Sequence, residues 1–123
     1  MSKHNGVSMS QVNDQLSVIF QGDIVLETLA ILNTDLLEYI QTHRITLVIL
    51  DLSAIVVLDL TEFKALHNIT LMIKLMGAET IFIGFNPGMV AFLISADADV
   101  SGINTASGLE DIDRVLKHLK GSE

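Results

Sequence analysis

The sequence predicts an α/β fold: a single domain with a mainly parallel sheet of four to five strands and about four helices packed on it. Apolar runs over residues 45–50 and 80–85 are rich in β-branched side chains, as in strands that are buried on both faces. Segments with apolar residues at helical spacing follow both runs, so strands and helices alternate. This alternation favours parallel strands joined by right-handed crossovers, and 123 residues suffice for one core.

The N-terminal third predicts an arm, a strand and a helix. Residues 1–10 are polar and show no pattern, so we expect a flexible arm, followed by the domain over residues 11–123. Residues 15–20 alternate between apolar and polar side chains, which is typical of a strand. After a turn, residues 24–40 carry an apolar stripe at helical spacing.

A helix start follows the central strand and is the first candidate for a functional site. Asp59 and Glu62 have the spacing of a capping box, and Gly77 stands where a left-handed C-cap is expected. The free N–H groups and the positive dipole end of such a helix favour an anion or a phosphorylated side chain. We therefore expect a docking or phosphorylation point at residues 59–62, with ordinary capping as the alternative.

The last third predicts one more strand and two helices. After the strand at residues 80–85, Asn86 and Pro87 have the residue types preferred at the N-cap and N1 positions of a helix. Ser107 and Glu110 have the spacing of a second capping box, which would open the final helix.

The polar loop over residues 97–104 has room for a short edge strand near Ile103. Its Asp97-Ala-Asp99-Val-Ser101-Gly102 run copies the first half of a calcium-binding loop, but Gly108 stands where the bidentate glutamate would be needed. We expect Asp97 and Asp99 to be solvated carboxylates.

Composition excludes several functions. A net charge of −8 argues against nucleic acid and anionic membranes as partners, and the absence of cysteine excludes disulfides and thiolate chemistry. No run of about 18 apolar residues could span a membrane, and the first residues lack the apolar segment of a signal peptide. We therefore expect a cytoplasmic protein without direct membrane insertion.

Catalytic and cofactor motifs are also missing from the sequence. No phosphate-binding glycine loop and no nucleophile–base pair stands out, so we expect a protein that is not an enzyme and needs no cofactor. The histidines are scattered over different elements, so we expect solvated side chains and no metal site. They are His4, His43, His67 and His118.

Three segments resemble the STAS domain, named for sulphate transporters and anti-sigma-factor antagonists. They are VILDLSAIVVLDLTEFKAL at residues 48–66, KLMGAETIFIGFNPGMVAFL at residues 74–93 and INTASGLEDIDRVLKHL at residues 103–119. The chain is most similar to the single-domain, RsbS-like antagonists and scaffold proteins of the bacterial stressosome. The resemblance implies a STAS-like single domain that binds a switch serine kinase of the anti-sigma type. It also implies co-assembly with STAS paralogues or with itself. In such proteins, phosphorylation of the STAS domain releases the kinase.

The resemblance places a phosphoacceptor Ser or Thr directly after Asp59, where this chain has Leu60. Three interpretations remain. Thr61 could be a displaced acceptor, although one helical step turns a side chain by about 100°. The alignment could shift by one residue at this turn. We favour the third, in which the site is not phosphorylated and binding is permanent. A second regulatory Thr of the family would precede Gly84, where this chain has Ile83.

The resemblance also suggests which residues meet the partner, because both helix starts would lie at the same edge of a parallel sheet. The expected contact residues are Asp59, Leu60, Thr61, Glu62, Phe63, Asn86, Pro87 and Gly88. Leu60 is expected to be an exposed apolar contact. Two alternatives are a STAS subunit that regulates a membrane transport system, and a small-ligand binder or enzyme using a cleft near Asp59, Thr61 and Asn86.

Overall fold

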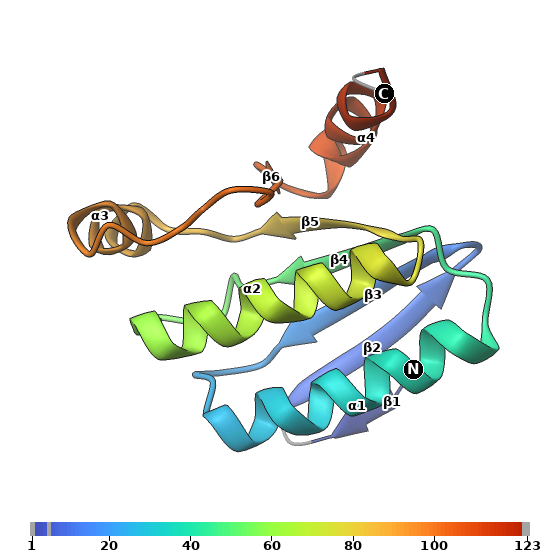
Figure 1. The fold of residues 1–123 in the computed structure, drawn as a ribbon, viewed down its shortest axis with the longest axis horizontal. Helices are drawn as coiled ribbons and strands as arrows, with labels where there is room; N and C mark the ends of the chain where they lie inside the picture. The colour runs from blue at the N-terminus through green and yellow to red at the C-terminus, as the bar shows by residue number, and fades with distance from the viewer. Residues whose placement is uncertain (1, 5, 122–123) are drawn as a thin grey trace.

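The computed structural model describes residues 2–4 and 6–121, which form one sheet with helices packed on it (Figure 1). In sheet order, which is also chain order, the strands are β1 (Ser2–His4), β2 (Val7–Val12), β3 (Gln15–Phe20), β4 (Leu47–Asp51), β5 (Glu79–Ile83) and β6 (Thr105–Ala106). The helices are α1 (Leu26–Thr42), α2 (Leu60–Leu75), α3 (Pro87–Ser95) and α4 (Ile112–Gly121), with a 3₁₀ turn η1 (Leu109–Asp111) before α4.

Strands β3 to β6 pair in parallel, whereas β1, β2 and β3 pair antiparallel. The predicted α/β architecture, with a mainly parallel sheet and about four helices, is therefore confirmed. The sheet has six strands because the N-terminal residues also join it.

The prediction of a flexible arm over residues 1–10 is corrected by β1 and β2. Val7 is 5% exposed, and Met9 packs against the same core beneath α1. These alternate apolar residues, together with backbone pairing to β3, hold the segment in the sheet. The apolar alternation is short, because polar Gln11 takes the next position on the same face. The sheet thus extends beyond the predicted boundary at residue 11. Residues 1 and 5 of the predicted arm, and residues 122–123 of the predicted domain, lie outside the described part of the chain.

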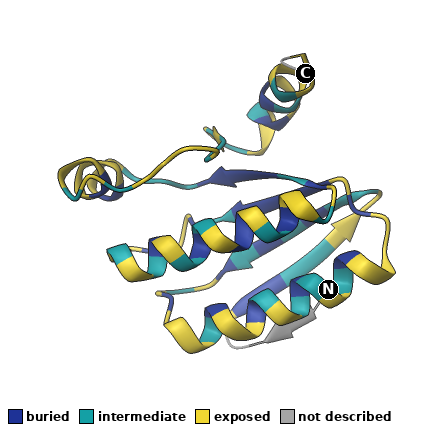
Figure 2. Ribbon diagram, in the orientation of Figure 1, coloured by how far each residue is buried: buried dark blue, intermediate teal, exposed yellow. Residues whose placement is uncertain are grey.

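The two faces of the sheet are covered differently. Helices α1 and α2 lie side by side across one face (Figure 1), where Val48 and Leu50 of β4 join the larger apolar cluster. Leu47 and Ile49 alternate to the other face, where Val115 of α4 packs against them. Strand β4 is thus buried on both faces, as its apolar run predicts (Figure 2).

In the last third of the chain, one element end follows its predicted signal and two depart from theirs. Asn86 caps α3, with its Oδ1 accepting from the Met89 N–H at 2.8 Å. The predicted Ser107–Glu110 capping box is wrong: the Ser107 N–H donates to Asp111 Oδ2 at 3.1 Å, and α4 begins only at Ile112. The edge strand predicted near Ile103 is β6, two residues later.

One histidine is not the solvated residue that was expected. His67 stacks on Phe63, and its Nε2 lies 2.9 Å from the Ser101 carbonyl oxygen, which ties α2 to the loop before β6. His43 stacks on Tyr39, His118 is exposed, and the side chain of His4 lies outside the described part. Across the described residues no three His, Asp or Glu side chains are arranged to hold a metal ion.

Asp99 also has a structural partner within the calcium-like run. Its Oδ1 accepts from the N–H and the hydroxyl of Ser101, at 3.0 and 2.6 Å, and these bonds lower the pKa of Asp99. The carboxylate thus closes a local turn.

Candidate functional site

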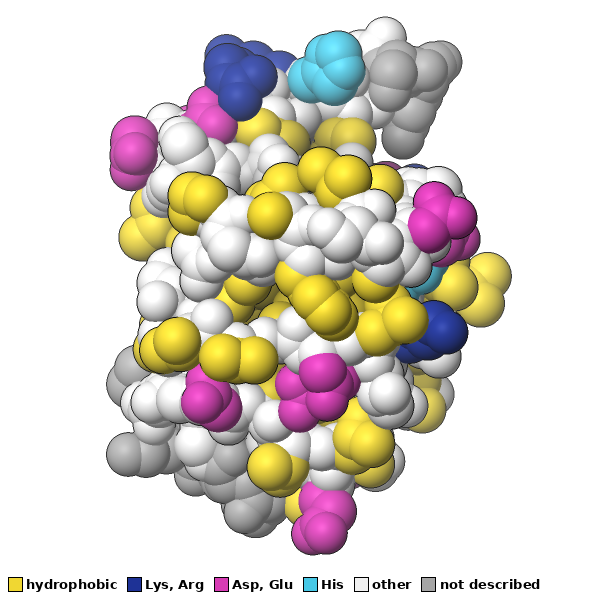
Figure 3. Space-filling view, turned by 90° about the vertical axis from the view of Figure 1, so that its left-hand side faces the viewer, with side chains coloured by type: hydrophobic (Ala, Val, Ile, Leu, Met, Phe, Trp, Pro, Cys, Tyr) yellow, Lys and Arg dark blue, Asp and Glu magenta, His cyan; other side chains and the backbone are white. Residues whose placement is uncertain are grey.

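The candidate site lies at the edge of the sheet where the parallel strands end. Strands β3, β4 and β5 run in the same direction, so the segments that follow them meet at one edge. Figure 3 views the molecule from this side, with hydrophobic side chains spread over much of the face and acidic groups between them. The predicted contact residues around the two helix starts all belong to this edge.

A loop over residues 52–59 connects β4 to α2 and forms the centre of this edge. Leu52, Ile55 and Leu58 are buried at three-residue intervals, so they anchor the loop to the core. The intervening Val56 and Val57 are 74% and 65% exposed. The Val56 N–H donates to Asp23 Oδ1 at 3.1 Å, which fixes the loop to the turn after β3. Two apolar side chains are thus held in solvent by a well-anchored loop.

Gly84 allows the turn after β5 to approach this loop. Its φ of +90° lies in the left-handed region, and a Cβ at this position would stand 2.4 Å from the Ser53 nitrogen and 2.7 Å from the Ser53 Cα. The Leu52 N–H donates to the Ile83 carbonyl at 2.8 Å beside this contact. Glycine is required both by the backbone conformation and by the available space.

The start of α2 forms the predicted capping box. Asp59 Oδ1 accepts from the Glu62 N–H at 2.7 Å, and the Asp59 N–H donates to Glu62 Oε1 at 3.1 Å. The reciprocal bonds fix the helix start and occupy both carboxylates with backbone donors.

The three side chains around this capping box have different exposures. Leu60, the first residue of the helix, is half-buried, whereas Thr61 is exposed. Phe63 is 1% exposed and belongs to the core, so its prediction as a surface contact is wrong. Residues three apart lie on the same face of a helix, so the burial of Phe63 at N4 also turns Leu60 at N1 partly toward the core. Leu60 therefore presents only part of its side chain, less than expected.

The start of α3 is the second predicted contact region. Pro87 and Gly88 are exposed and Asn86 is half-buried at the cap. Phe63 of α2 and Val90 of α3 line one pocket, which places the two helix starts near each other. We call Val56, Val57 and residues 59–62 and 86–88 the strand-end surface.

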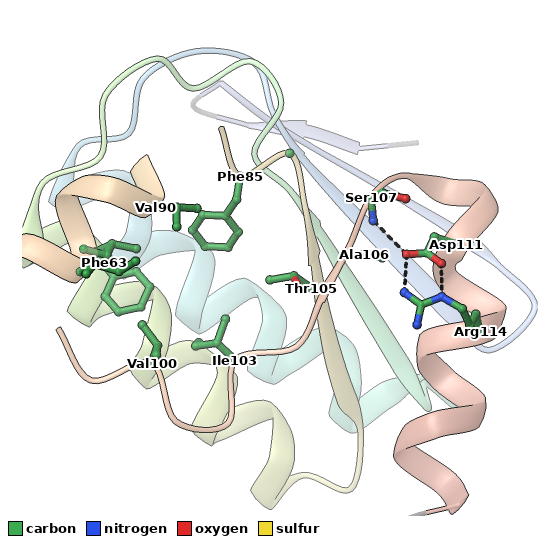
Figure 4. Close-up of a pocket in the computed structure, with 13 residues that line it drawn as sticks. Phe63, Phe85, Val90, Val100, Ile103, Thr105, Ala106, Ser107, Asp111 and Arg114 are labelled. Carbon is green, nitrogen blue, oxygen red and sulfur yellow. Dashed lines mark hydrogen bonds and ion pairs between the residues drawn. The ribbon is translucent and has the colours of Figure 1, made fainter. Parts of the chain in front are cut away.

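A pocket of about 700 Å³ adjoins the strand-end surface, between α3, the loop before β6 and the start of α4 (Figure 4). Its polar end carries an ion pair in which Arg114 donates from Nε to Asp111 Oδ1 at 2.5 Å and from Nη2 to Oδ2 at 2.8 Å. These bonds, with the Ser107 N–H, lower the pKa of Asp111 to about 2. The same pair raises the pKa of Arg114.

Acid is expected to weaken the start of α4 through Asp111. Its pKa falls from 3.8 to about 2 on folding, so the carboxylate stabilises the folded chain above pH 3.8. That contribution is lost as the pH falls from about 4 to about 2. An Asp111→Asn variant should be less stable than the wild type at pH 6, with the difference shrinking toward pH 2. Urea unfolding at pH 6, 4, 3 and 2 measures it, and a difference independent of pH would contradict the assignment.

Comparison with known proteins identifies the fold. No family model and no curated protein matches the sequence. Among solved structures, a variant of RsbS from Moorella thermoacetica superposes with a TM-score of 0.75 at 22% identity, covering 93% of this chain and 97% of that one. The anti-sigma-factor antagonist SpoIIAA, in its unphosphorylated form, superposes with a TM-score of 0.69 at 12% identity, covering 90% and 96%. The chain has the STAS fold.

Two further solved structures contain a similar fold. A chain from a structure of the stressosome, a signal integration and transduction hub, gives a TM-score of 0.71 at 22% identity, covering 92% of this chain and 99% of that one. The murine anion transporter Slc26a9 gives 0.67 at 14% identity, but this chain covers only 18% of it. At these identities the likeness establishes the STAS fold. In the described part of this chain, no helix is long and apolar enough to cross a membrane.

Sequence reasoning located both helix starts but missed other features of the edge. It did not single out Val56 and Val57. Ile55 and Leu58 on either side of them are buried, and all four residues could be buried together only in a strand, whereas this segment is a loop. It also missed the pocket, which is lined by Phe63 of α2 and by residues from Gly84 onward.

Proposed function

We propose that this chain is a non-enzymatic regulatory module, an anti-sigma-factor antagonist or stressosome-type scaffold that acts in the bacterial cytoplasm. It binds a serine-kinase switch protein through the strand-end surface. The observation that carries the proposal is Leu60, a half-buried apolar residue at the first position of α2, directly after the capping Asp59.

The side-chain chemistry of Leu60 bears on regulation. A phosphate at this position would add nearly two negative charges to a face that already carries Asp59 and Glu62, and would oppose binding of the partner. Leucine has no hydroxyl and cannot be modified in this way. Thr61 is exposed but lies one helical step away, about 100° around the helix axis. The chain therefore stays in its binding-competent state.

Apolar exposure supports a role in protein contacts. Val56 and Val57 are exposed in the loop that leads to Leu60, and α3 leaves Val90 and Ile94 43% and 74% exposed. Aliphatic side chains with carboxylates around them fit a partner surface with an apolar centre and a basic rim. The exposed side of α3 is available for STAS paralogues or for a second copy of this chain.

A second candidate is a STAS subunit that regulates a membrane transport system, which the likeness to part of Slc26a9 favours. In that case the strand-end surface would bind a transporter component in place of a kinase.

The test uses the serine kinase of the anti-sigma type encoded nearest to this gene. The two proteins are incubated with and without ATP and examined by size exclusion and intact mass. We expect a stable complex under both conditions and no added phosphate on this chain. Absence of a complex at micromolar concentrations would overturn the proposed function. Phosphate mapped to Thr61, with loss of the complex, would make the chain a switchable antagonist and overturn permanent binding.

A further inference from the structure

The pocket next to the strand-end surface has the size and the polarity of a ligand site. Its volume of about 700 Å³ lies within the range of sites for small organic molecules, about 300 to 1,000 Å³. It is bounded by α3 and the loop before β6 on one side and by β6 and the start of α4 on the other (Figure 4).

Most of the pocket is apolar. Phe63 and Leu93, which are 1% and 5% exposed, line its buried part, with the half-buried Ile103 beside them. Val90 and Val100, which are 43% and 53% exposed, line its outer part. Figure 4 shows the larger apolar side chains at the end opposite the Asp111–Arg114 pair, and the small side chain of Ala106 nearer to that pair. An apolar body would therefore be buried at one end, while a polar group would lie at the other.

The polar end offers hydrogen-bond donors in excess of acceptors. The Asp111 carboxylate already accepts from Arg114 Nε, Arg114 Nη2 and the Ser107 N–H. Arg114 Nη1 and the Thr105 hydroxyl have no hydrogen-bond partner among the described residues, and Thr105 projects between the two ends of the pocket (Figure 4). A complementary ligand group must accept hydrogen bonds, as a carbonyl oxygen does.

Charge distinguishes between possible acceptor groups. The positive charge of Arg114 is compensated by Asp111, and the chain as a whole carries −8. A carboxylate or phosphate ligand would gain little attraction here and would meet the negative field of the protein. A neutral carbonyl or amide gains the hydrogen bond without this penalty.

We propose that this pocket binds an uncharged amphipathic molecule, with its apolar body against Phe63, Leu93 and Ile103 and a carbonyl or amide oxygen bound by Arg114 and Thr105. Such a ligand contacts both α2 and α3, the helices that carry the strand-end surface.

The experiment uses the neutral fluorescent probe N-phenyl-1-naphthylamine with the full chain, followed by displacement with decanamide and with decanoate. We expect the probe to bind, and decanamide to displace it at concentrations about tenfold lower than decanoate. Val100→Trp should fill the pocket and weaken probe binding at least tenfold. Leu75→Trp is the matched control, since Leu75 is 89% exposed at the far end of α2. This variant should bind the probe like the wild type.

The head-group assignment has its own variant. Arg114→Met should raise the decanamide concentration needed about tenfold, because a hydrogen bond to a charged donor is lost, while the affinity for the probe stays unchanged. Decanamide should also shift the methyl resonances of Val90, Val100 and Ile103, a readout that does not depend on how any variant folds. Absence of probe binding, equal binding by Val100→Trp and Leu75→Trp, or tighter binding of decanoate than of decanamide would each overturn the proposal.

Discussion

Replacing Gly84 with alanine is expected to lower the free energy of unfolding by about 2 to 4 kcal/mol. A φ of +90° is strained for any residue with a Cβ, at about 1 to 3 kcal/mol, and the new methyl group would overlap the Ser53 backbone. The loop over residues 52–59 would have to move away from β5, which also breaks the bond between the Leu52 N–H and the Ile83 carbonyl. Urea unfolding of Gly84→Ala measures the loss.

Gly77 provides the matched control for this prediction. Its φ of +94° is nearly the same, but a Cβ there would meet no atom within 4 Å. Gly77→Ala should therefore cost only the backbone term, about 1 kcal/mol. Equal losses in the two variants would mean that the contact with Ser53 does not constrain the strand-end surface.

Leu60→Asp is expected to weaken binding of the switch kinase at least fiftyfold, and Leu60→Ala about fivefold. Alanine removes part of an apolar contact, of the order of 1 kcal/mol for a half-buried leucine. Aspartate removes the same contact and also places an unpaired charge in an apolar interface. An acidic residue in the first turn agrees with the helix dipole, so the fold of Leu60→Asp should be preserved. Isothermal titration with the kinase measures both affinities.

Leu75 offers the comparison at the other end of the same helix. It is 89% exposed and far from the strand-end surface, so Leu75→Asp should bind the kinase with wild-type affinity. Equal effects of Leu60→Asp and Leu60→Ala would remove Leu60 from the interface. A loss of affinity in Leu75→Asp of the same size would place the interface elsewhere on α2.

The features that the sequence predicted correctly are those determined by neighbouring residues. The capping box of Asp59 and Glu62 and the cap at Asn86 form within a single turn, so their residue types and spacing suffice. Strand β4 was recognisable because it is buried on both faces and therefore apolar throughout. Strand β2 was missed because it is stabilised by pairing with β3, and only its alternate residues Val7 and Met9 contact the core.

The candidate site was harder to predict because its geometry depends on contacts between distant segments. The outward position of Val56 and Val57 follows from the anchoring of Leu52, Ile55 and Leu58, and from the bond to Asp23. Phe63 was assigned to the surface because its helix start was correctly located, whereas its burial depends on the direction of α2 across the sheet. Asp111 was overlooked because Glu110 fits the capping-box spacing, although the 3₁₀ turn brings the next carboxylate to the Ser107 N–H.

The most direct test of permanent kinase binding is to restore the missing hydroxyl with Leu60→Ser. The wild type and this variant are each incubated with the switch kinase and ATP, then examined by intact mass and size exclusion. We predict that the wild type remains unmodified and bound, whereas Leu60→Ser gains one phosphate at position 60 and leaves the complex. A wild-type chain that is phosphorylated and released would contradict the account, as would a Leu60→Ser chain that binds but is never modified.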